Sequence, residues 1–417
     1  MLDQNAHSSN CLTGSRWMKT RLGELGQLIK GRGITRSEIR DEGLPCLRYG
    51  EIYSTYKTVT ARLSSRISQE SANQACALRS GDIVFAASGE TPEEIGKAIT
   101  YIGDEQAFVG GDTVVLRNHE QDPVFLAHFL NSDPIVREKS RLGKGQSVVH
   151  IHTPDLASIE VSLPPLVEQR KVAEILRTWD EALEKLAALR AAKELQYRAF
   201  ARKFFESCHP SFHGRPNNWR EFELGDIFTE RSEAGADGER LLSITMTGGV
   251  IDRDDVGRKD TSTEDKSRYK LVLPGDLAYN TMRMWQGVSG LSTMRGIVSP
   301  AYTVVTPKER RLLGRYAAHL FKSRRMVFDF ERYSQGLTSD TWNLKFPAFS
   351  KIKVRLPPVD DQEKRADLLD SMLCEQGVLR RQIEALTRQK RGLMQKLLTG
   401  QWRVKFASPS TNSKKGG

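Results

Sequence analysis

Residues 163–170 read LPPLVEQR, and residues 356–363 read LPPVDDQE, an offset of 193. Proline is tolerated in the first turn of a helix and rarely further in. The acidic residues that follow, Glu168 in one stretch and Asp360 and Asp361 in the other, would interact favourably with the positive end of a helix dipole. Each stretch therefore predicts the start of a helix, and its recurrence predicts that the chain consists of two related halves.

Other matches in the same order extend this repeat over most of the 417 residues. A Gly-Asp turn before an apolar run stands at both 81–82 and 275–276, and Trp17, followed by a Leu-Gly pair, matches Trp219. The stretches between the matches, such as 89–107, have no counterpart in the other half. An internal repeat predicts repeated structural units, and loops that vary on a fixed scaffold usually carry binding specificity.

Each half begins with about 140 residues of short apolar runs bounded by Gly, Asp, Asn and Pro, a pattern typical of strands and turns. The clearest strand predictions are 82–86, 113–116, 276–279 and 302–305. Short helices are predicted near 123–131 and 312–322. Each half is therefore predicted to form a mixed α/β lobe with a sheet at its core.

A long helix is predicted to end each half. Apolar residues recur at steps of three and four from Val172 to Leu189, and again from Leu369 to Leu397. Such a narrow stripe is typical of a coiled-coil seam or of one face of a helix bundle, and about 40 residues of helix would extend roughly 60 Å. The simplest packing is one helix antiparallel to the other, as a rigid spacer between the lobes. The alternative is two independent helices, each packed on its own lobe.

The duplicated motifs resemble those of the specificity subunits of type I restriction–modification enzymes. The start at 163–170 resembles the opening of their central conserved region, the start at 356–363 resembles that of their distal conserved region, and QKRGLMQKLLTG at 389–400 is similar to their C-terminal helix. The likeness runs from about Trp17 to Val404. The predicted fold class is α+β, with two mixed α/β lobes separated by a long antiparallel two-helix coiled coil and related by a pseudo-two-fold internal repeat.

The predicted domain boundaries follow from the repeat and the resemblance together. The lobes are expected to be target recognition domains, and the helices conserved spacers. The predicted segments are a flexible extension at 1–16, target recognition domain 1 at 17–162, the central spacer helix at 163–208, target recognition domain 2 at 209–355, the distal spacer helix at 356–404 and a flexible tail at 405–417.

The resemblance implies a DNA sequence-recognition subunit of a type I restriction–modification complex, with no catalysis by this chain alone. Each lobe is expected to read one half of a bipartite, asymmetric site in double-stranded DNA. The helices are expected to dock two methyltransferase subunits, and restriction and translocation subunits can join that core. S-adenosylmethionine, ATP and Mg²⁺ are expected on those partners, with no cofactor or metal on this chain.

Charge and cysteine content narrow the class of protein. The net charge of +11 indicates a polyanionic partner, although a basic protein without a nucleic-acid role would fit the charge alone. The five cysteines lie far apart without a CxxC pair, which argues against a disulfide framework or a four-cysteine zinc site.

The start of the chain shows no signal-peptide pattern, and no apolar run approaches the roughly 20 residues that cross a bilayer. We therefore expect a cytoplasmic protein without membrane contact.

The motifs that would make the chain an enzyme are incomplete. Both Pro-Pro pairs lack the preceding Asn or Asp and the following aromatic residue that an adenine methyltransferase would carry. The glycine-rich run at 26–33 lacks the Lys and hydroxyl residue of a phosphate-binding loop. Pro154-Asp155 lacks the Lys that a metal-dependent nuclease would place after it. Two groups of residues are each short of the four ligands of structural zinc, namely His150 with His152, and Cys208 with His209 and His213.

The candidate DNA contacts lie in loops that differ between the halves, or in turns before predicted helices. Arg can pair bidentately with guanine, and Asn or Gln with adenine, in the major groove; Lys and Arg also neutralise phosphates. In the first lobe the candidates are Arg48, Tyr49, Ser88, Glu90, Thr91, Lys97, Lys144, Gln146 and Ser147. In the second lobe they are Arg258, Lys259, Asn280, Arg283, Trp285, Gln286, Thr338 and Ser339. Each could equally be an ordinary surface or turn residue, and Trp285 is of a type more often found in a core.

Two other functions stay open on the sequence alone. A non-enzymatic coiled-coil adaptor would bind protein partners through its lobes, with little dependence on salt and no affinity for DNA. An enzyme with a dispersed site would transfer methyl groups or cleave DNA as the purified chain alone.

Overall fold

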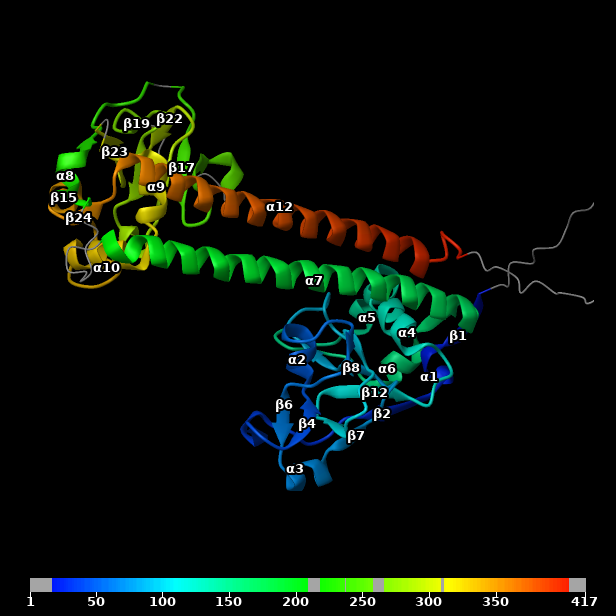
Figure 1. The fold of residues 1–417 in the computed structure, drawn as a ribbon. Coiled ribbons are helices and arrows are strands. Elements are labelled where there is room, and N and C mark those ends of the chain that lie inside the picture. Colours follow the sequence, from blue (N-terminus) through cyan, green and yellow to red (C-terminus); the bar gives the residue numbers. More distant parts are fainter. Residues whose placement is uncertain (1–16, 209–217, 237, 258–265, 309–310, 405–417) are drawn as a thin grey trace, which may run out of the picture. The chain divides into compact units, whose positions relative to one another are not determined.

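The structure is a computed structural model, and it describes residues 17–208, 218–236, 238–257, 266–308 and 311–404. Contacts divide the chain into two compact units. Unit 1 comprises the residues up to Lys185 and from Glu384 onward, and unit 2 comprises Leu186–Ile383. Each unit holds one lobe together with part of two 40-residue helices, α7 (Leu166–Phe205) and α12 (Val359–Leu398) (Figure 1).

The lobe of unit 1 contains two five-stranded sheets. The first has the order β2-β12-β8-β10-β5 and the second the order β3-β6-β4-β11-β7. The strands of the first are β2 (Gln27–Lys30), β12 (Thr113–Arg117), β8 (Ile83–Ala86), β10 (Ala98–Tyr101) and β5 (Val59–Thr60). Those of the second are β3 (Ile39–Arg40), β6 (Ser65–Ile67), β4 (Leu44–Leu47), β11 (Ala107–Val109) and β7 (Cys76–Leu78).

Six short helices accompany these sheets, namely α1 (Leu22–Leu25), α2 (Tyr49–Ser54), α3 (Gln69–Gln74), α4 (Pro123–Leu130), α5 (Asp133–Leu142) and α6 (Thr153–Ser158). Two small pairs complete the lobe: β1 (Met18–Arg21) with β14 (Glu160–Leu163), and β9 (Ser88–Gly89) with β13 (Val149–His150). Strands β8 and β12 and helix α4 confirm the elements predicted at 82–86, 113–116 and 123–131.

The lobe of unit 2 repeats this plan with smaller sheets. A four-stranded sheet has the order β16-β23-β20-β21. Its strands are β16 (Phe228–Glu230), β23 (Tyr302–Pro307), β20 (Leu277–Asn280) and β21 (Ser289–Leu291). Three antiparallel pairs join it, namely β15 (Arg220–Glu223) with β24 (Lys353–Leu356), β17 (Leu242–Thr245) with β18 (Gly249–Asp252), and β19 (Lys270–Val272) with β22 (Gly296–Val298).

The helices of this lobe are α8 (Leu224–Ile227), α9 (Gly314–Leu320), α10 (Arg324–Tyr333) and α11 (Phe346–Phe349), with a 3-10 turn η4 (Met284–Gln286). Strands β20 and β23 and helix α9 confirm the elements predicted at 276–279, 302–305 and 312–322. The helix begins only at Gly314, two residues later than the start of the predicted range.

The repeat is visible in equivalent contacts. In unit 1, Leu22 N donates to Ile159 O at 2.9 Å; in unit 2, Leu224 N donates to Ile352 O at 2.8 Å. In each lobe a strand from the beginning pairs antiparallel with the strand that leads into the long helix, β1 with β14 and β15 with β24. Both lobes therefore close on themselves just before the proline pair, which explains why the chain can start a new element there.

A buried glutamine fastens the start of each long helix to its lobe. Gln169 Oε1 accepts from Asp122 N at 3.0 Å, and its amide donates to Pro164 O at 2.8 Å. Gln362, at the same repeat position, accepts from Leu313 N at 3.0 Å and donates to Pro357 O at 2.9 Å. Buried polar groups need such partners, so the glutamine of the LPP motif is the residue that ties helix to lobe.

The two long helices pack antiparallel in both units. In unit 1, Lys390 Nζ of α12 lies 2.6 Å from Asp180 of α7, and Arg403, beyond the end of α12, lies 2.7 Å from Glu168 at the start of α7. Residue numbers rise along one helix as they fall along the other. In unit 2 the same order holds, with Lys193 against Glu375 at 2.7 Å and Arg365 against the Phe204 carbonyl at 2.9 Å. The predicted antiparallel pairing is confirmed, and the alternative of two independent helices is wrong.

Each lobe shares its core with the helices. The core of unit 1 includes Phe85 and Phe125 of the lobe, Leu176 of α7 and Leu397 and Leu398 of α12. The core of unit 2 likewise joins aromatic residues of its lobe, such as Phe321, to Phe205 of α7 and Leu369 of α12. Neither α7, α12 nor another helix within the described ranges is long and apolar enough to span a membrane.

Candidate nucleic-acid interface

The predicted contacts of the first lobe come together around Tyr53 of α2. Its hydroxyl donates to Ser88 O at 3.1 Å, and its carbonyl accepts from Lys97 Nζ at 3.4 Å. Burial raises the pKa of Tyr53, so the hydroxyl stays protonated and can donate. Arg48 and Tyr49 stand at the start of the same helix. Two predicted segments, 48–49 and 88–97, are thus joined through one residue, Tyr53, which was not among the candidates.

The third segment, at 144–150, is linked to them through a short strand pair. Ser88 of β9 lies opposite His150 of β13, and the Ser88 hydroxyl is 2.9 Å from His150 Nδ1. Residues 144–150 form a loop closed by two hydrogen bonds between Lys144 and His150, of 2.9 and 2.8 Å. We call segments 87–97 and 144–150 the loop pair of lobe 1.

The side chains of these candidates differ in exposure. Ser88 is buried, and Arg48 and Lys97 are partly buried. Arg48 also lies 3.5 Å from Glu51, and burial lowers the pKa of Lys97. The exposed candidates are Tyr49, Glu90, Thr91, Lys144, Gln146 and Ser147. In this arrangement the buried candidates hold the loops, and the exposed ones are available to a ligand.

The second lobe has an equivalent loop pair, residues 281–288 and 335–343. The second loop is closed by hydrogen bonds of 2.9 and 2.8 Å between Gln335 and Asn343, and Leu344 N donates to Thr281 O at 2.9 Å. That last bond matches the one from Ile151 N to the Ala87 carbonyl in lobe 1, of 3.0 Å. The structure therefore brings together predicted segments in both lobes, at equivalent positions of the repeat.

A pair of tryptophans joins the two loops of lobe 2. The rings of Trp285 and Trp342 meet edge to face with centroids 5.5 Å apart, and Trp285 Nε1 donates to Met282 O at 3.0 Å. Both are partly buried, as expected of residues that support a surface. Asn280 accepts from Met282 N through its side chain, at 3.0 Å. The exposed candidates are Arg283, Gln286, Thr338 and Ser339, and Arg258 and Lys259 lie outside the described residues.

Sequence reasoning missed several exposed residues beside these loops. Leu337, at the tip of the second loop of lobe 2, is fully exposed, and Met282 is 46% exposed. Helix α10, which packs beside η4, carries an exposed Phe328 flanked by two arginines. Met282 directly precedes the candidate Arg283, which could have led to it; the remaining residues carry no signal in one sequence.

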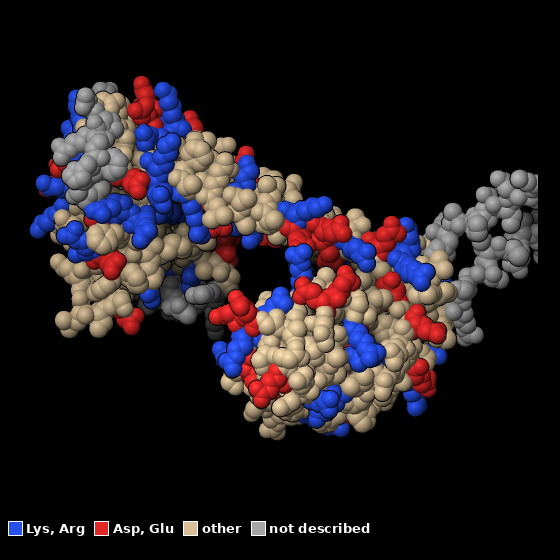
Figure 2. Space-filling view, turned by 60° about the horizontal axis from the view of Figure 1, so that its bottom comes forward, with Lys and Arg blue, Asp and Glu red and all other residues tan. Residues whose placement is uncertain are grey.

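Positive charge is unevenly distributed over the two lobes. Residues 209–355 hold 24 Lys and Arg against 18 Asp and Glu, whereas residues 17–162 hold 17 against 19. On the face seen in Figure 2, blue side chains gather on unit 2, while unit 1 shows both charges mixed. A polyanion would therefore be attracted more strongly by the lobe of unit 2.

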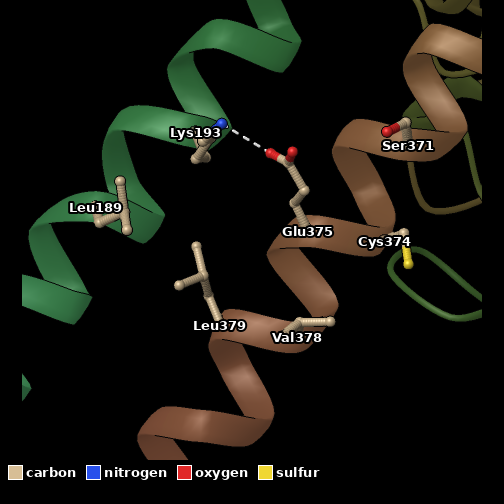
Figure 3. Close-up of a pocket in the computed structure, with 7 residues that line it drawn as sticks. All are labelled: Leu189, Lys193, Ser371, Cys374, Glu375, Val378 and Leu379. Atoms are coloured by element: carbon tan, nitrogen blue, oxygen red, sulfur yellow. Dashed lines mark ion pairs between the residues drawn. The ribbon is translucent and has the colours of Figure 1, made fainter.

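The paired helices carry a groove of about 440 Å³ within unit 2. Leu189 of α7 and Leu379 of α12 face each other across it, and the ion pair between Lys193 and Glu375 lies at one side (Figure 3). Its lining is mainly apolar, with Val378 40% exposed. Lys193 and Glu375 are paired with each other there, and the mainly apolar lining suits contact with a protein.

The groups examined for metal binding have other roles. His152 N donates to Asp155 at 3.1 Å as part of a helix start, and Cys208 is buried against the Tyr316 hydroxyl at 3.3 Å. His209 and His213 lie outside the described residues. Among the residues that are described, no three His, Cys, Asp or Glu side chains come close enough to share an ion.

Comparison with known proteins shows which family this chain is similar to. Residues 14–193 match the family described as type I restriction modification DNA specificity domain. The putative type I restriction enzyme MjaX specificity subunit of Methanocaldococcus jannaschii is 23% identical over 93% of this chain and 94% of its own length. The type I restriction enzyme EcoKI specificity subunit of Escherichia coli is 22% identical over 93% of this chain and 90% of its own.

Residues 14–193 therefore carry a type I specificity domain, and nearly the whole chain is similar to type I specificity subunits. The resemblance predicted from the duplicated motifs is thereby confirmed, as is DNA recognition for a type I restriction–modification system. The fold of this chain also agrees with that of a solved S subunit of a type I restriction–modification system from M. genitalium. That structure covers 93% of this chain and 98% of its own, with a TM-score of 0.59 at 19% identity.

Proposed function

We propose that each lobe of this specificity subunit reads one half of a bipartite, asymmetric DNA site, through its own loop pair. The observation that carries the proposal is the equivalence of the two loop pairs, which are closed by matching backbone hydrogen bonds but present different side chains. Lobe 1 presents Lys144, Gln146 and Ser147, whereas lobe 2 presents Thr338 and Ser339. Equivalent placement with different chemistry favours two half-sites of different sequence.

Within each loop pair the exposed polar residues can read base edges. Gln146 and Gln286 can each bond an adenine bidentately in the major groove, and Arg283 can do the same with a guanine. Contacts of this kind discriminate against a wrong base by about 1–3 kcal/mol each. The buried members of the loop pairs act by holding the readers in place.

We further propose that α7 and α12 fix the gap between the half-sites and dock two methyltransferase subunits. Antiparallel pairing in both units makes the helices suited to a stiff spacer, and the apolar groove around Leu189 and Leu379 is suited to a protein partner. A solved structure that resembles this chain, with a TM-score of 0.56 and 16% identity, is described as showing the structural basis of complex assembly and conformational transition in the type I system. Restriction subunits would join such a core.

In this proposal catalysis belongs to the partner subunits. S-adenosylmethionine, ATP and Mg²⁺ would bind there, and the chain would contribute sequence choice and placement of the target adenine. We therefore expect the purified chain to assemble with its partners but to show no methyl transfer or DNA cleavage by itself.

The test is selection of bound duplexes from a random-sequence library by the purified full chain. We expect two short conserved blocks separated by a gap of fixed length. Insertion of one base pair into the gap rotates one block relative to the other by a tenth of a turn, and binding should fall at least about tenfold. The paired variants Gln146→Ala/Ser147→Ala and Arg283→Ala/Gln286→Ala should each relax only one block.

Enrichment of a single block, or tolerance of any gap, would contradict reading by two lobes. No enrichment, combined with salt-insensitive binding of protein partners, would favour the adaptor instead. Methyl transfer by the chain alone would establish the dispersed enzyme.

A further inference from the structure

Helix α10 of the second lobe exposes an aromatic ring between two guanidinium groups. The Cζ atoms of Arg325 and Arg332 lie 5.3 and 5.8 Å from the centre of the Phe328 ring, which is 46% exposed. Residues three, four and seven apart share one face of a helix, so the three side chains form one surface. Cation–π attraction holds both arginines over the ring.

The charge pattern of α10 opposes what a free helix prefers. Its first turn contains Arg324 and Arg325 and no acidic residue, although the positive end of a helix dipole favours acidic side chains. The acidic residues of the helix are Glu331 and Asp329, and Asp329 lies 4.0 Å from Arg325 Nε. Three arginines against two carboxylates leave a positive excess that an anion would neutralise.

The equivalent helix of the first lobe is built differently. Helix α5 begins with Asp133, and an offset of 191 places Pro134, Arg137 and Arg141 opposite the three residues of the α10 surface. Arg141 lies 3.2 Å from Glu138 on the same helix. In both lobes one arginine lies near a carboxylate of its own helix, so the difference is that lobe 1 has no aromatic ring at this surface.

Helix α10 contacts one loop of the lobe 2 pair near its start and leads into the other at its end. Near its start, Val327 lies against Gly287 at the end of η4, where a Cβ would come within 3.1 Å of the valine side chain. Past its end, the loop closed by Gln335 and Asn343 begins two residues after Tyr333. A duplex read by these loops would pass close to this helix.

We infer that Arg325 and Arg332, held by Phe328, bind phosphate groups of the DNA backbone beside the half-site read by lobe 2. The inference rests on the proposed function. The planar guanidinium fits phosphate oxygens bidentately, and backbone contacts fix register without carrying sequence information. Lobe 1, with a slight excess of acidic residues, has no matching clamp, so this surface would supply much of the salt-sensitive affinity.

The test compares two matched double variants of the full chain on its selected duplex, over a range of salt concentrations. For Arg325→Gln/Arg332→Gln, the slope of log affinity against log salt should fall by about 1.8, since each phosphate contact contributes about 0.9. Affinity at low salt should fall at least tenfold, and the preference for the target over a one-base variant should stay within twofold. The control Arg137→Gln/Arg141→Gln on α5 removes the same charge and should change the slope by less than 0.5.

A third variant, Phe328→Leu, tests the role of the ring. It should weaken binding severalfold with the slope unchanged, because both charges remain but are less well held. Thermal unfolding of each variant checks that the lobe still folds.

Equal slope changes in the two double variants would overturn the inference, because the charges would then act only through the general field. Unchanged DNA binding with loss of a protein partner would overturn it by assigning the surface to protein. If the wild-type chain selects no two-block site, the proposed function fails; if it does and the α10 variant binds like it, only this inference fails.

Discussion

The two lobes share a plan of strands, helices and closed loops but hold their equivalent carboxylates in different ways. Asp82 and Asp276 occupy the same Gly-Asp turn and are both buried. Asp82 is held by Arg117, on a strand of its own sheet, at 2.6 Å, whereas Asp276 is held by Arg231 at 2.8 Å and by the hydroxyl of the strand residue Thr306 at 2.7 Å. The repeat thus preserves the buried aspartate but not the position of its arginine partner, because any cation that reaches the carboxylate can neutralise it.

The largest difference should appear when these arginines are removed. Arg117→Met would leave the buried Asp82 carboxylate with the hydrogen bond from Arg79 N, at 2.8 Å, but without its ion pair. The free energy of unfolding should fall by about 3–5 kcal/mol. Arg231→Met should cost only roughly 2 kcal/mol, because the Thr306 hydroxyl and a backbone N–H remain. Urea unfolding of both variants measures the difference, and equal losses would contradict it.

A second difference concerns a buried lysine. Lys139 of α5 is 1% exposed and donates to Gly96 O behind the loop pair of lobe 1, whereas Phe330 fills the equivalent position of α10. Burial lowers the pKa of Lys139 to about 7. An unfolded lysine titrates near 10.4, so between these values the unfolded chain binds more protons and stability rises with pH. Below pH 7 the lysine is protonated in both states, so the full free-energy cost of burying its charge opposes folding.

The variant Lys139→Met should therefore raise the free energy of unfolding by about 2–4 kcal/mol at pH 6.5 and flatten its rise toward pH 9. It should also loosen the loop that Lys139 holds, so that selection of the first DNA block is relaxed while the second is unchanged. Urea unfolding at the two pH values, with Phe330→Met as the matched change in the other lobe, tests this. A wild-type chain whose stability does not rise over this pH range would rule it out.

How far the sequence could lead depends on the kind of contact. The starts of α7 and α12 follow from covalent and dipole effects local to the LPP motif, and the antiparallel pairing from the helical period of Leu and Ile; both were predictable. The gathering of loops around Tyr53 was not, because the bond from its hydroxyl to Ser88 joins residues 35 apart whose proximity leaves no trace in a single sequence. Burial of the candidates Ser88 and Lys97 was hidden for the same reason.

Where the lobes are alike, matched substitutions should have matched effects. Gln169→Leu and Gln362→Leu each remove a buried amide that bonds one backbone N–H and the carbonyl oxygen of a proline. The backbone groups left without partners should cost about 2–3 kcal/mol in either case. Urea unfolding should give values that agree within about 1 kcal/mol, and a clear inequality would show that the two helix starts are not equivalent.

The smallest effect should come from the aromatic support of lobe 2. Trp342 packs on Trp285, and the equivalent position of lobe 1 is Val149, a buried strand residue. Trp342→Val should leave the fold intact but free η4 to move, because the edge-to-face contact, worth about 0.5–1.5 kcal/mol, is lost. We expect about a fivefold loss of preference for the second DNA block, without change at the first. Binding to duplexes substituted in one block at a time measures this, and a loss spread over both blocks would mean that the loop pairs do not read independently.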